Sequence, residues 1–386
     1  RNGPLTYEVE LYQGCVRFKR GCKFCIEPKK GIPIWREEQD IIDEVNLAIE
    51  NGVQNIRLGG ATDIYTYKAE GVLDLEYPIP NPEPISDLLF GLRENENLQI
   101  LHVDNGNPSI IAENLGPSSE ITKAMIDTLS DGAVLSFGLE SADPLVHSTN
   151  WLNCDPKQLI SAISHINDYG RKRGLRGLPK LLPGLNFIAG LNGETATSYQ
   201  MNLKLLQDIR NKGLLLRRIN IRQVEGQGFQ DIPEKTFKEF KEIVRNTIDK
   251  PLLEELFPFG SIIRDVWWES HNNRIRDPKQ VINLEHRDIS IYGKSGITFG
   301  RQIGAYPILT GIPYLLPLET KSDVIITGHG MRSISAVEIG LDINNVTQNQ
   351  LSAIPGLGVK GAWKVISKRA IQLNKNNEKI TSVSEA

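Results

Sequence analysis

The sequence predicts an α/β fold in which a partial (β/α)6 TIM-like barrel precedes a small C-terminal β module. Between residue 7 and about residue 249, short apolar runs alternate six times with amphipathic stretches, the pattern of β/α units and a parallel sheet. After that point the chain becomes Gly-rich with short alternating runs, which is typical of a small β barrel. At 386 residues the chain is also too long for one ordinary core.

Each of the six units is expected to hold one strand and one helix. The strands are expected at 7–12, 55–59, 98–103, 133–138, 185–190 and 218–224, and the helices at 36–50, 85–95, 119–130, 156–172, 195–212 and 234–248. Ser118 or Ser119 is expected to cap the third helix, and Asp155 to cap the fourth, ahead of Pro156. A Pro-bearing insertion at 61–84 follows the second strand, where binding loops of β/α folds lie, and is interpreted as a lid.

The expected domain organisation has five parts. Residues 1–249 form the barrel, 250–283 a connector, 284–345 a small β-rich module, 346–373 a pair of short helices, and 374–386 a polar tail. Within the β module, strands are expected in "DISIYG", "ITFGRQIG" and "DVIITGHG".

Composition excludes several classes of protein. No apolar run approaches the roughly 20 residues that a membrane-spanning helix needs, and the start lacks a secretory pattern, so a cytoplasmic location is expected. The net charge of -3 argues against electrostatic binding of nucleic acid by the protein as a whole, although a local basic surface could still bind it. Because the chain begins at Arg1, close to its first strand, we expect the natural protein to extend further at its N-terminus.

Three of the four cysteines crowd into the loop after the first strand. Cys15, Cys22 and Cys25 have the spacing C-x6-C-x2-C, and their thiolates suit an iron-sulfur cluster, zinc or copper(I). A structural zinc site would need a fourth ligand, either Cys154 or a distant His. A cluster with only three protein ligands leaves one iron open, which indicates catalysis. A zinc knuckle or unrelated thiols are the alternatives.

This segment resembles the radical S-adenosylmethionine (radical SAM) superfamily, whose Cys triad binds a 4Fe-4S cluster in this loop. The last Cys of that triad typically follows an aromatic residue, as Phe24 precedes Cys25 here. The usual spacing is C-x3-C-x2-C, so this chain has three extra residues between its first two cysteines. "RLGGATD", with Gly59 and Gly60, resembles the family's Gly-Gly-Glu motif for the methionyl amino group. Ala61 replaces its acid, so that role is unfilled or passes to Asp63.

Two later segments extend the resemblance. Glu140 and Ser141, in "FGLESADP", resemble the family's polar pair near the ribose and carboxylate of the cofactor. "LNFIAGLNGETATSY" is similar to the fifth-strand segment of the methylthiotransferase-like branch, with Asn186 as a weaker cofactor candidate. Glu194 in that segment is better explained as a helix cap. Substrate contacts or ordinary capping are expected at the strand ends, from Asp104, Asn105, Asn107, Arg222 and Gln223.

The resemblance implies reductive cleavage of S-adenosylmethionine to a 5'-deoxyadenosyl radical, which abstracts a substrate hydrogen. It implies a 4Fe-4S cluster and S-adenosylmethionine as cofactors, and an external electron donor as a partner. No residue of this chain is assigned as catalytic.

The C-terminal segment 351–369 resembles a helix-hairpin-helix. Gly356 and Gly358 lie in the expected hairpin, which would expose backbone N–H groups to a phosphate, and Lys360 would add charge. Internal packing is the alternative role. The β module is similar in position to the RNA-binding barrel of methylthiotransferases, without a decisive motif. The basic run at 171–180 is either a solvated face or a phosphate-binding stripe.

These observations predict a radical SAM enzyme of a branch with a C-terminal helix-hairpin-helix, acting on a nucleic acid such as tRNA. One alternative is a radical enzyme acting on a protein or a small molecule. The other is a non-catalytic nucleic-acid-binding protein with a structural metal site.

Overall fold

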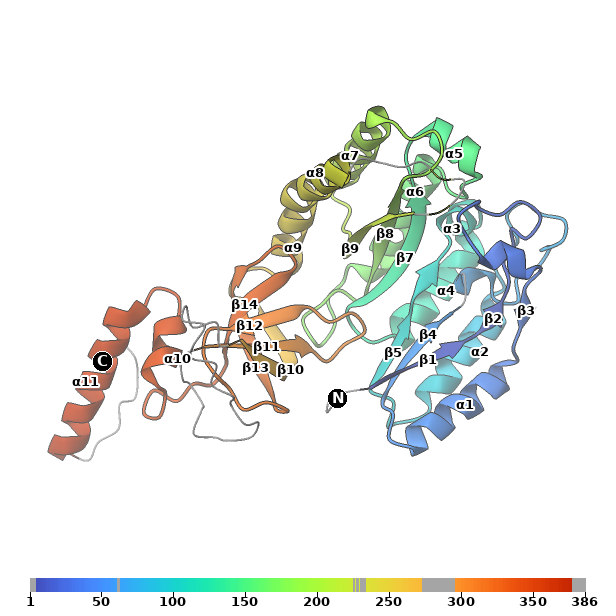
Figure 1. The fold of residues 1–386 in the computed structure, drawn as a ribbon. Helices are drawn as coiled ribbons and strands as arrows, with labels where there is room; N and C mark the ends of the chain where they lie inside the picture. The colour runs from blue at the N-terminus through green and yellow to red at the C-terminus, as the bar shows by residue number, and fades with distance from the viewer. Residues whose placement is uncertain are drawn as a thin grey trace. The chain divides into compact units, whose positions relative to one another are not determined.

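The computed structural model describes residues 5–60, 63–224, 226, 229, 234–272 and 296–376. The chain divides into two compact units (Figure 1). The N-terminal unit comprises residues 4–252 with 304–306, and the C-terminal unit comprises 253–303 and 307–386. Each unit is described separately below.

The N-terminal unit is built on parallel strands. One sheet has the order β1 (Thr6–Glu10), β4 (Asn55–Gly59), β5 (Ile100–Val103), and the other has the order β6 (Asn105–Gly106), β7 (Ala133–Glu140), β8 (Leu181–Ala189), β9 (Arg218–Gln223). All neighbouring pairs in both sheets are parallel. Only Asp104 separates β5 from β6. The last strand of the first sheet therefore leads directly into the first strand of the second sheet, and the strands of both sheets lie in chain order. The predicted α/β class with parallel strands is confirmed, and its closure into a partial barrel stays a prediction.

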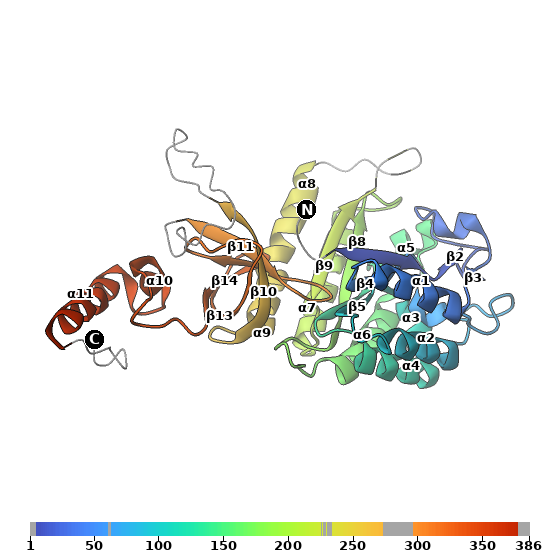
Figure 2. The same ribbon diagram turned by 90° about the horizontal axis from the view of Figure 1, so that it is seen from below.

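Helices pack side by side against the sheets in the order of the chain. Neighbouring pairs are α1 (Glu38–Glu50) with α2 (Pro82–Arg93), α2 with α4 (Leu115–Thr128), and α4 with α6 (Pro156–Gly170), as Figure 2 shows from below. They are followed by α7 (Ala196–Asn211) and α8 (Glu234–Val244). Two short helices, α3 (Pro108–Glu113) and α5 (Pro144–Asn150), were not expected from the sequence.

Alternation along the strands separates an apolar face from a polar one. On β4, Ile56 and Leu58 are buried, whereas Arg57 between them is partly exposed. On β7, Phe137 and Leu139 are buried, whereas Ser136 is partly exposed. The apolar residues form the core, and the polar residues are left to line an open face. This polar face leads to the strand ends where the candidate site lies.

One predicted helix cap is correct and one is wrong. Asp155 caps α6 and forms a capping box with Gln158. Ser118 and Ser119 do not cap α4, because this helix begins earlier, after Asn114. The Gly-Pro pair ahead of the serines is tolerated in the first turn, where a Pro loses no intrahelical hydrogen bond.

The insertion after β4 packs into the core. Its short helix η2 (Ile64–Thr66) is buried, and so is Tyr67. Ala69 and Val72 form a small apolar cluster with Val16 of the cysteine loop. The structure therefore gives this segment a supporting role where the sequence suggested a lid.

The C-terminal unit contains a closed barrel in the order β10-β11-β12-β14-β13. Its strands are β10 (Ile262–Asn272), β11 (Ile297–Gln302), β12 (Leu309–Ile312), β13 (Lys321–His329) and β14 (Ser333–Glu338). The predicted small barrel is present, but β10 and the helix α9 (Lys250–Leu256) lie in the segment expected to be a connector. The expected strand "DISIYG" lies outside the described residues.

Two helices follow the barrel, α10 (Gln348–Ala353) and α11 (Gly358–Asn376). Leu351, Ala362 and Val365 form their apolar core, with Ile354 and Leu357 packed against it. Gly356 and Gly358 both have positive φ, at 85° and 58°, so the turn requires residues that tolerate the left-handed region. The second helix, at 19 residues, is longer than expected. In the described part of the chain, no helix has both the length and the apolar character needed to cross a membrane.

Candidate functional site

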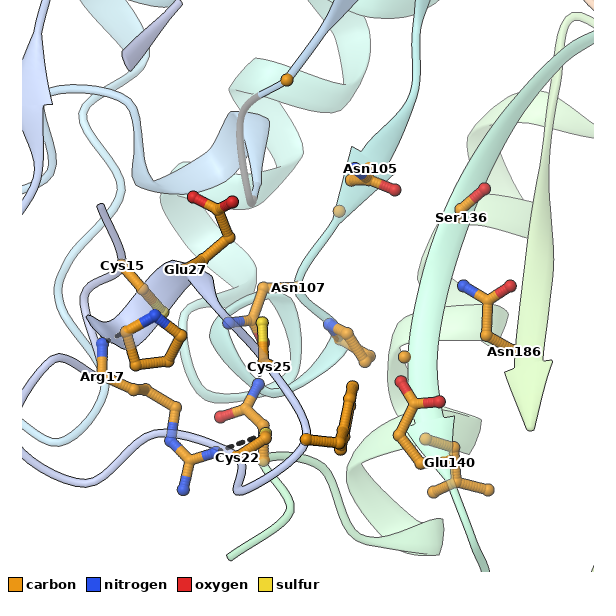
Figure 3. Close-up of a pocket in the computed structure, with 18 residues that line it drawn as sticks. Cys15, Arg17, Cys22, Cys25, Glu27, Asn105, Asn107, Ser136, Glu140 and Asn186 are labelled. Atoms are coloured by element: carbon orange, nitrogen blue, oxygen red, sulfur yellow. Dashed lines mark hydrogen bonds between the residues drawn. The ribbon is translucent and has the colours of Figure 1, made fainter. Parts of the chain in front are cut away.

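A cavity of about 380 Å³ lies at the carboxyl ends of the parallel strands (Figure 3). All three clustered cysteines line it, together with side chains from the ends of β7 and β8 and from the loop after β5. Its lining residues are Cys15, Arg17, Cys22, Phe24, Cys25, Glu27, Pro28, Gly60, Asn105, Gly106, Asn107, Pro108, Ser136, Gly138, Leu139, Glu140, Asn153 and Asn186.

The cysteine loop is closed by a short antiparallel pair, β2 (Tyr12–Gln13) with β3 (Ile34–Trp35). Inside this pair, the N–H of Cys15 donates to the carbonyl of Gly31 at 3.1 Å. Gly14 has a φ of 93°, and a Cβ there would lie 2.7 Å from the carbonyl oxygen of Ile32. The segments that begin and end the cysteine loop can therefore approach each other this closely only with glycine at position 14.

Burial determines the protonation state of the three thiols. It raises the pKa of Cys15 to about 11 and that of Cys22 to about 12, and it raises the pKa of Cys25 as well. The thiols are therefore protonated at neutral pH unless a cation replaces their protons. Among the described residues, no three His, Cys, Asp or Glu side chains are grouped so that they could hold a metal ion. All three thiols nevertheless line the same cavity.

Arg17 lies against the thiols. Its Nη1 donates to Cys22 Sγ at 3.3 Å and to the carbonyl of Trp151 at 3.0 Å. Lys19, two residues on, donates through Nζ to the carbonyl of Leu73 in the insertion. Trp151 lies 134 residues further along the chain than Arg17, so no local sequence pattern indicates this contact.

Glu140 enters the cavity from a β-bulge at the end of β7. The register between β7 and β8 shifts between Gly138 and Glu140, and Glu140 itself has a φ of 69°. A non-Gly residue in this left-handed region is strained by about 1–2 kcal/mol. Its Oε2 is buried and has no hydrogen-bond partner among the residues that the structure describes, and burial raises the pKa of the carboxyl to about 8, against a lowering effect of Arg222. Bulges of this kind are common beside active sites, where they redirect a side chain.

Some of the predicted cofactor residues line the cavity. Phe24, Gly60, Glu140 and Asn186 do so with the three cysteines. Gly60 has a φ of 71°, which glycine adopts at little cost.

Gly59, Asp63 and Ser141 do not line the cavity, and the structure gives each another role. A Cβ on Gly59 would lie 2.4 Å from Oε1 of Glu8, so this glycine makes room for a side chain of β1. Asp63 is buried and accepts the N–H groups of Tyr65 and Asn107 at 3.0 and 2.9 Å. Ser141 is fully buried and accepts the N–H of Asp143 at 3.2 Å.

The polar strand ends form connected chains of hydrogen bonds. Asn220 of β9 donates to Asn186 at 2.9 Å and accepts from Arg218 at 2.7 Å. Asn153 donates to Asn107 at 2.6 Å, and both residues line the cavity. Asn105 and Asn107 are residues expected at a strand end, whereas Asn153 follows the unpredicted helix α5 and no sequence motif indicated it. Asp104 forms an ion pair with Arg57 and does not line the cavity.

The Gly-Glu-Thr segment is structural. Glu194 accepts the N–H of Gly190, and Thr195 caps α7 in a capping box with Ser198. The cap of α7 is therefore Thr195, whereas the carboxylate of Glu194, for which a capping role was favoured, bonds to the turn that follows β8. In the C-terminal unit, Gly356 and Gly358 form the turn between α10 and α11, and Lys360 is exposed in the first turn of α11.

The chain is similar to two archaeal proteins, each described as uncharacterized. One, from Methanocaldococcus jannaschii, is 36% identical over 344 residues, which cover 86% of this chain and 60% of the relative. The other, from Archaeoglobus fulgidus, is 36% identical over 366 residues, covering 91% of this chain and 63% of the relative. The chain thus spans less than two thirds of the length of these relatives. No family model matches it.

More distant similarity reaches proteins with a named activity. The tRNA-2-methylthio-N(6)-dimethylallyladenosine synthase of Geobacter sulfurreducens is 25% identical over 215 residues, covering 54% of this chain and 41% of the enzyme. Among solved structures, the cobalamin-dependent S-adenosylmethionine radical enzyme OxsB has 16% identity and a TM-score of 0.40, covering 64% of this chain and 30% of OxsB. A likeness at that TM-score has no bearing on function.

Proposed function

We propose that this chain is a radical SAM enzyme that binds a 4Fe-4S cluster and S-adenosylmethionine and generates a 5'-deoxyadenosyl radical. One observation carries the proposal. The three thiols of the C-x6-C-x2-C loop line the same cavity as Glu140, whose carboxyl oxygen Oε2 is buried and has no partner in the described part of the chain. A buried polar atom of this kind in a cavity calls for a ligand.

The donor set fits an iron-sulfur cluster. Thiolates are the usual ligands of such clusters, each holding a different iron, and all three thiols of the loop line this one cavity. Because burial raises the pKa values of Cys15 and Cys22, binding of the cluster must displace their protons. Arg17, at 3.3 Å from Cys22 Sγ, would offset part of the negative charge of the bound thiolates.

The rest of the cavity offers polar groups to S-adenosylmethionine. Gly60 lets its backbone approach the methionyl part closely, Glu140 accepts from hydroxyl or amino groups, and Asn186 donates and accepts. When bound, the cluster supplies the electron and S-adenosylmethionine the radical on which the reaction depends. The chain's own residues orient the cofactor, and Phe24 and Leu139 exclude water beside it.

The proposal is tested by anaerobic reconstitution of the chain with iron and sulfide, followed by incubation with dithionite and S-adenosylmethionine. We expect about four irons per chain, together with 5'-deoxyadenosine and methionine as products. A chain that takes up zinc instead, or that holds a full cluster and forms neither product, would contradict the proposal.

We further propose that the substrate is a nucleic acid, bound in part by the C-terminal unit as a helix-hairpin-helix. Helices α10 and α11 carry no acidic residue, whereas Lys360, Lys364 and Lys368 are exposed at intervals of four on α11. This spacing places the three cations on one side of a helix, where they can contact a phosphate backbone. The distant relative from Geobacter sulfurreducens is a tRNA-modifying synthase, which is compatible with this substrate class.

Lys360→Glu tests this part of the proposal. We expect weaker binding of tRNA and a smaller dependence of affinity on salt, because one phosphate contact is replaced by a repulsion. Lys235→Glu, on α8 of the N-terminal unit, is the control. If the affinity and the salt dependence of Lys360→Glu equal those of the wild type, the hairpin plays no part in recognition.

A further inference from the structure

The cysteine loop, residues 14–35, forms a basic surface around Trp151. Residues 14–35 contain six Lys and Arg against one Glu, although the whole chain has a net charge of -3. Arg20 lies over the ring of Trp151 with its Cζ 5.4 Å from the centroid, and Lys23 Nζ lies 4.9 Å from the same centroid. Arg17 donates to the carbonyl of that residue. We call Trp151, Arg17, Arg20 and Lys23 the Trp151 patch.

Trp151 is held in position and yet open to solvent. It ends α5 in the left-handed region, with a φ of 54°, and 40% of its surface is exposed. Asn150 beside it is fully buried and bonds to both the carbonyl and the N–H of Asn192. The N–H of Lys23 donates to the carbonyl of Asn150 at 3.1 Å, which fixes the cysteine loop to the same turn. An exposed Trp in a strained but anchored backbone is a costly arrangement unless its ring has a function.

The cations of the patch are not neutralised. Within the described ranges, Arg17, Arg20 and Lys23 form no ion pair, whereas Glu27 of the same loop is already paired with Lys30 at 2.8 Å. Exposed cations without partners attract an anion most strongly when several are close together. The patch therefore has uncompensated positive charge beside an exposed aromatic ring.

The patch adjoins the cavity directly. Nη1 of Arg17 is within hydrogen-bond distance of both the carbonyl of Trp151 and the sulfur of Cys22, and Arg17 and Cys22 line the cavity. A polymer held on Trp151 would thus lie next to the cavity where the proposed chemistry takes place.

We infer that the Trp151 patch binds single-stranded nucleic acid, with one base stacked on Trp151 in place of Arg20 and Lys23, whose exposed side chains turn from the ring to the adjacent phosphates. Clustered cations around an aromatic side chain are the combination by which proteins hold single strands, because every base has a face that can stack. An acidic protein surface would use the cations but not the ring. The inference rests on the proposed function for its substrate class and adds the site where the strand enters.

The test measures binding of a fluorescein-labelled single-stranded RNA to the full, reconstituted chain by anisotropy over a series of salt concentrations. Trp151→Leu removes the stacking face, and we expect a loss of affinity of about 5- to 150-fold. Trp151→Tyr keeps an aromatic face and should recover most of that loss. Arg20→Gln with Lys23→Gln should reduce the slope of log affinity against log salt by about 1.4.

Two controls keep the result interpretable. Lys235→Gln with Lys238→Gln removes two positive charges from exposed positions on α8, outside the patch and the cavity lining, and should leave affinity unchanged. The iron content of each variant reports whether the cysteine loop has kept its structure.

The outcomes separate the inference from the proposed function. If the Trp151→Leu and Arg20→Gln/Lys23→Gln variants bind RNA as the wild type does, the patch is not the entry site, even where 5'-deoxyadenosine still forms. If the charge variants lose binding of a poly-glutamate peptide as strongly as they lose RNA, and Trp151→Leu loses neither, the patch is a docking site for an acidic protein and the inference is wrong. RNA binding that depends on the patch in a chain unable to cleave S-adenosylmethionine would support the inference and contradict the proposed function.

Discussion

Tyr12 and Asp63 are hydrogen-bonded in both directions. The N–H of Asp63 donates to the Tyr12 hydroxyl at 3.0 Å, and that hydroxyl lies 2.7 Å from the carbonyl oxygen of Asp63, to which it donates. Tyr12 immediately precedes the cysteine loop, and Asp63 begins the described part of the insertion after β4. One buried hydroxyl therefore connects the segment that carries the thiols to the segment that supports it.

Tyr12→Phe should destabilise the N-terminal unit. The substitution leaves the buried N–H and carbonyl of Asp63 without their partner, at a cost of about 1–3 kcal/mol in the free energy of unfolding. Urea unfolding measures this cost. Tyr7→Phe is the matched control, because the Tyr7 hydroxyl bonds to Glu44 at the exposed surface and its loss should change stability by less than about 0.5 kcal/mol. Equal losses in the two variants would contradict the buried role of Tyr12.

Gly138→Ala should weaken binding of S-adenosylmethionine without unfolding the chain. A Cβ at Gly138 would lie 2.6 Å from Oε1 of Glu140, so the carboxylate must move away from its present position. Loss of one hydrogen bond to this buried carboxyl predicts a weakening of about tenfold, measurable by equilibrium dialysis of the reconstituted protein. Gly116→Ala, where a Cβ meets nothing within 4 Å, should bind as the wild type does. Unchanged affinity in Gly138→Ala would exclude Glu140 from the cofactor site.

Acidic pH should destabilise the chain through His102. This side chain is 4% exposed, and burial lowers its pKa from 6.5 to about 4. Between these two values the unfolded chain binds a proton that the folded chain does not, so stability falls as the pH is lowered.

From pH 7 to pH 5, the loss attributable to His102 is about 2 kcal/mol. His102→Gln carries no such group and should lose that much less over the same interval, as measured by urea unfolding at each pH. A variant whose stability falls with pH as steeply as that of the wild type would show that His102 is not the group responsible.

The alternation of apolar and polar residues located the parallel strands, because each strand buries the side chains of one face and exposes those of the other. It failed at Glu140, where the bulge breaks the alternation of β7: Glu140 enters the cavity and Ser141, its neighbour in the motif, is buried elsewhere. It also failed at β10, whose register is irregular against both neighbouring strands, so its sequence does not alternate cleanly.

Spacing brought Cys15, Cys22 and Cys25 to one loop, and the structure places all three on one cavity. It could not reveal the contact between Arg17 and Trp151, since these residues are 134 positions apart in the chain. A residue's partners across such a distance are set by the packing of the strands and helices, which a local pattern does not contain.

The account depends most on the three clustered cysteines acting together, and formation of 5'-deoxyadenosine by cysteine variants tests this directly. Cys154 serves as the control, because it is fully buried, does not line the cavity and donates to the carbonyl of Asp155. After anaerobic reconstitution with iron and sulfide, and with dithionite as reductant, we expect the wild type and Cys154→Ser to form 5'-deoxyadenosine from S-adenosylmethionine. Cys15→Ser, Cys22→Ser and Cys25→Ser should form none. Product that persists after loss of any one of these three thiols, or a fully reconstituted wild type that forms no product, would contradict the account.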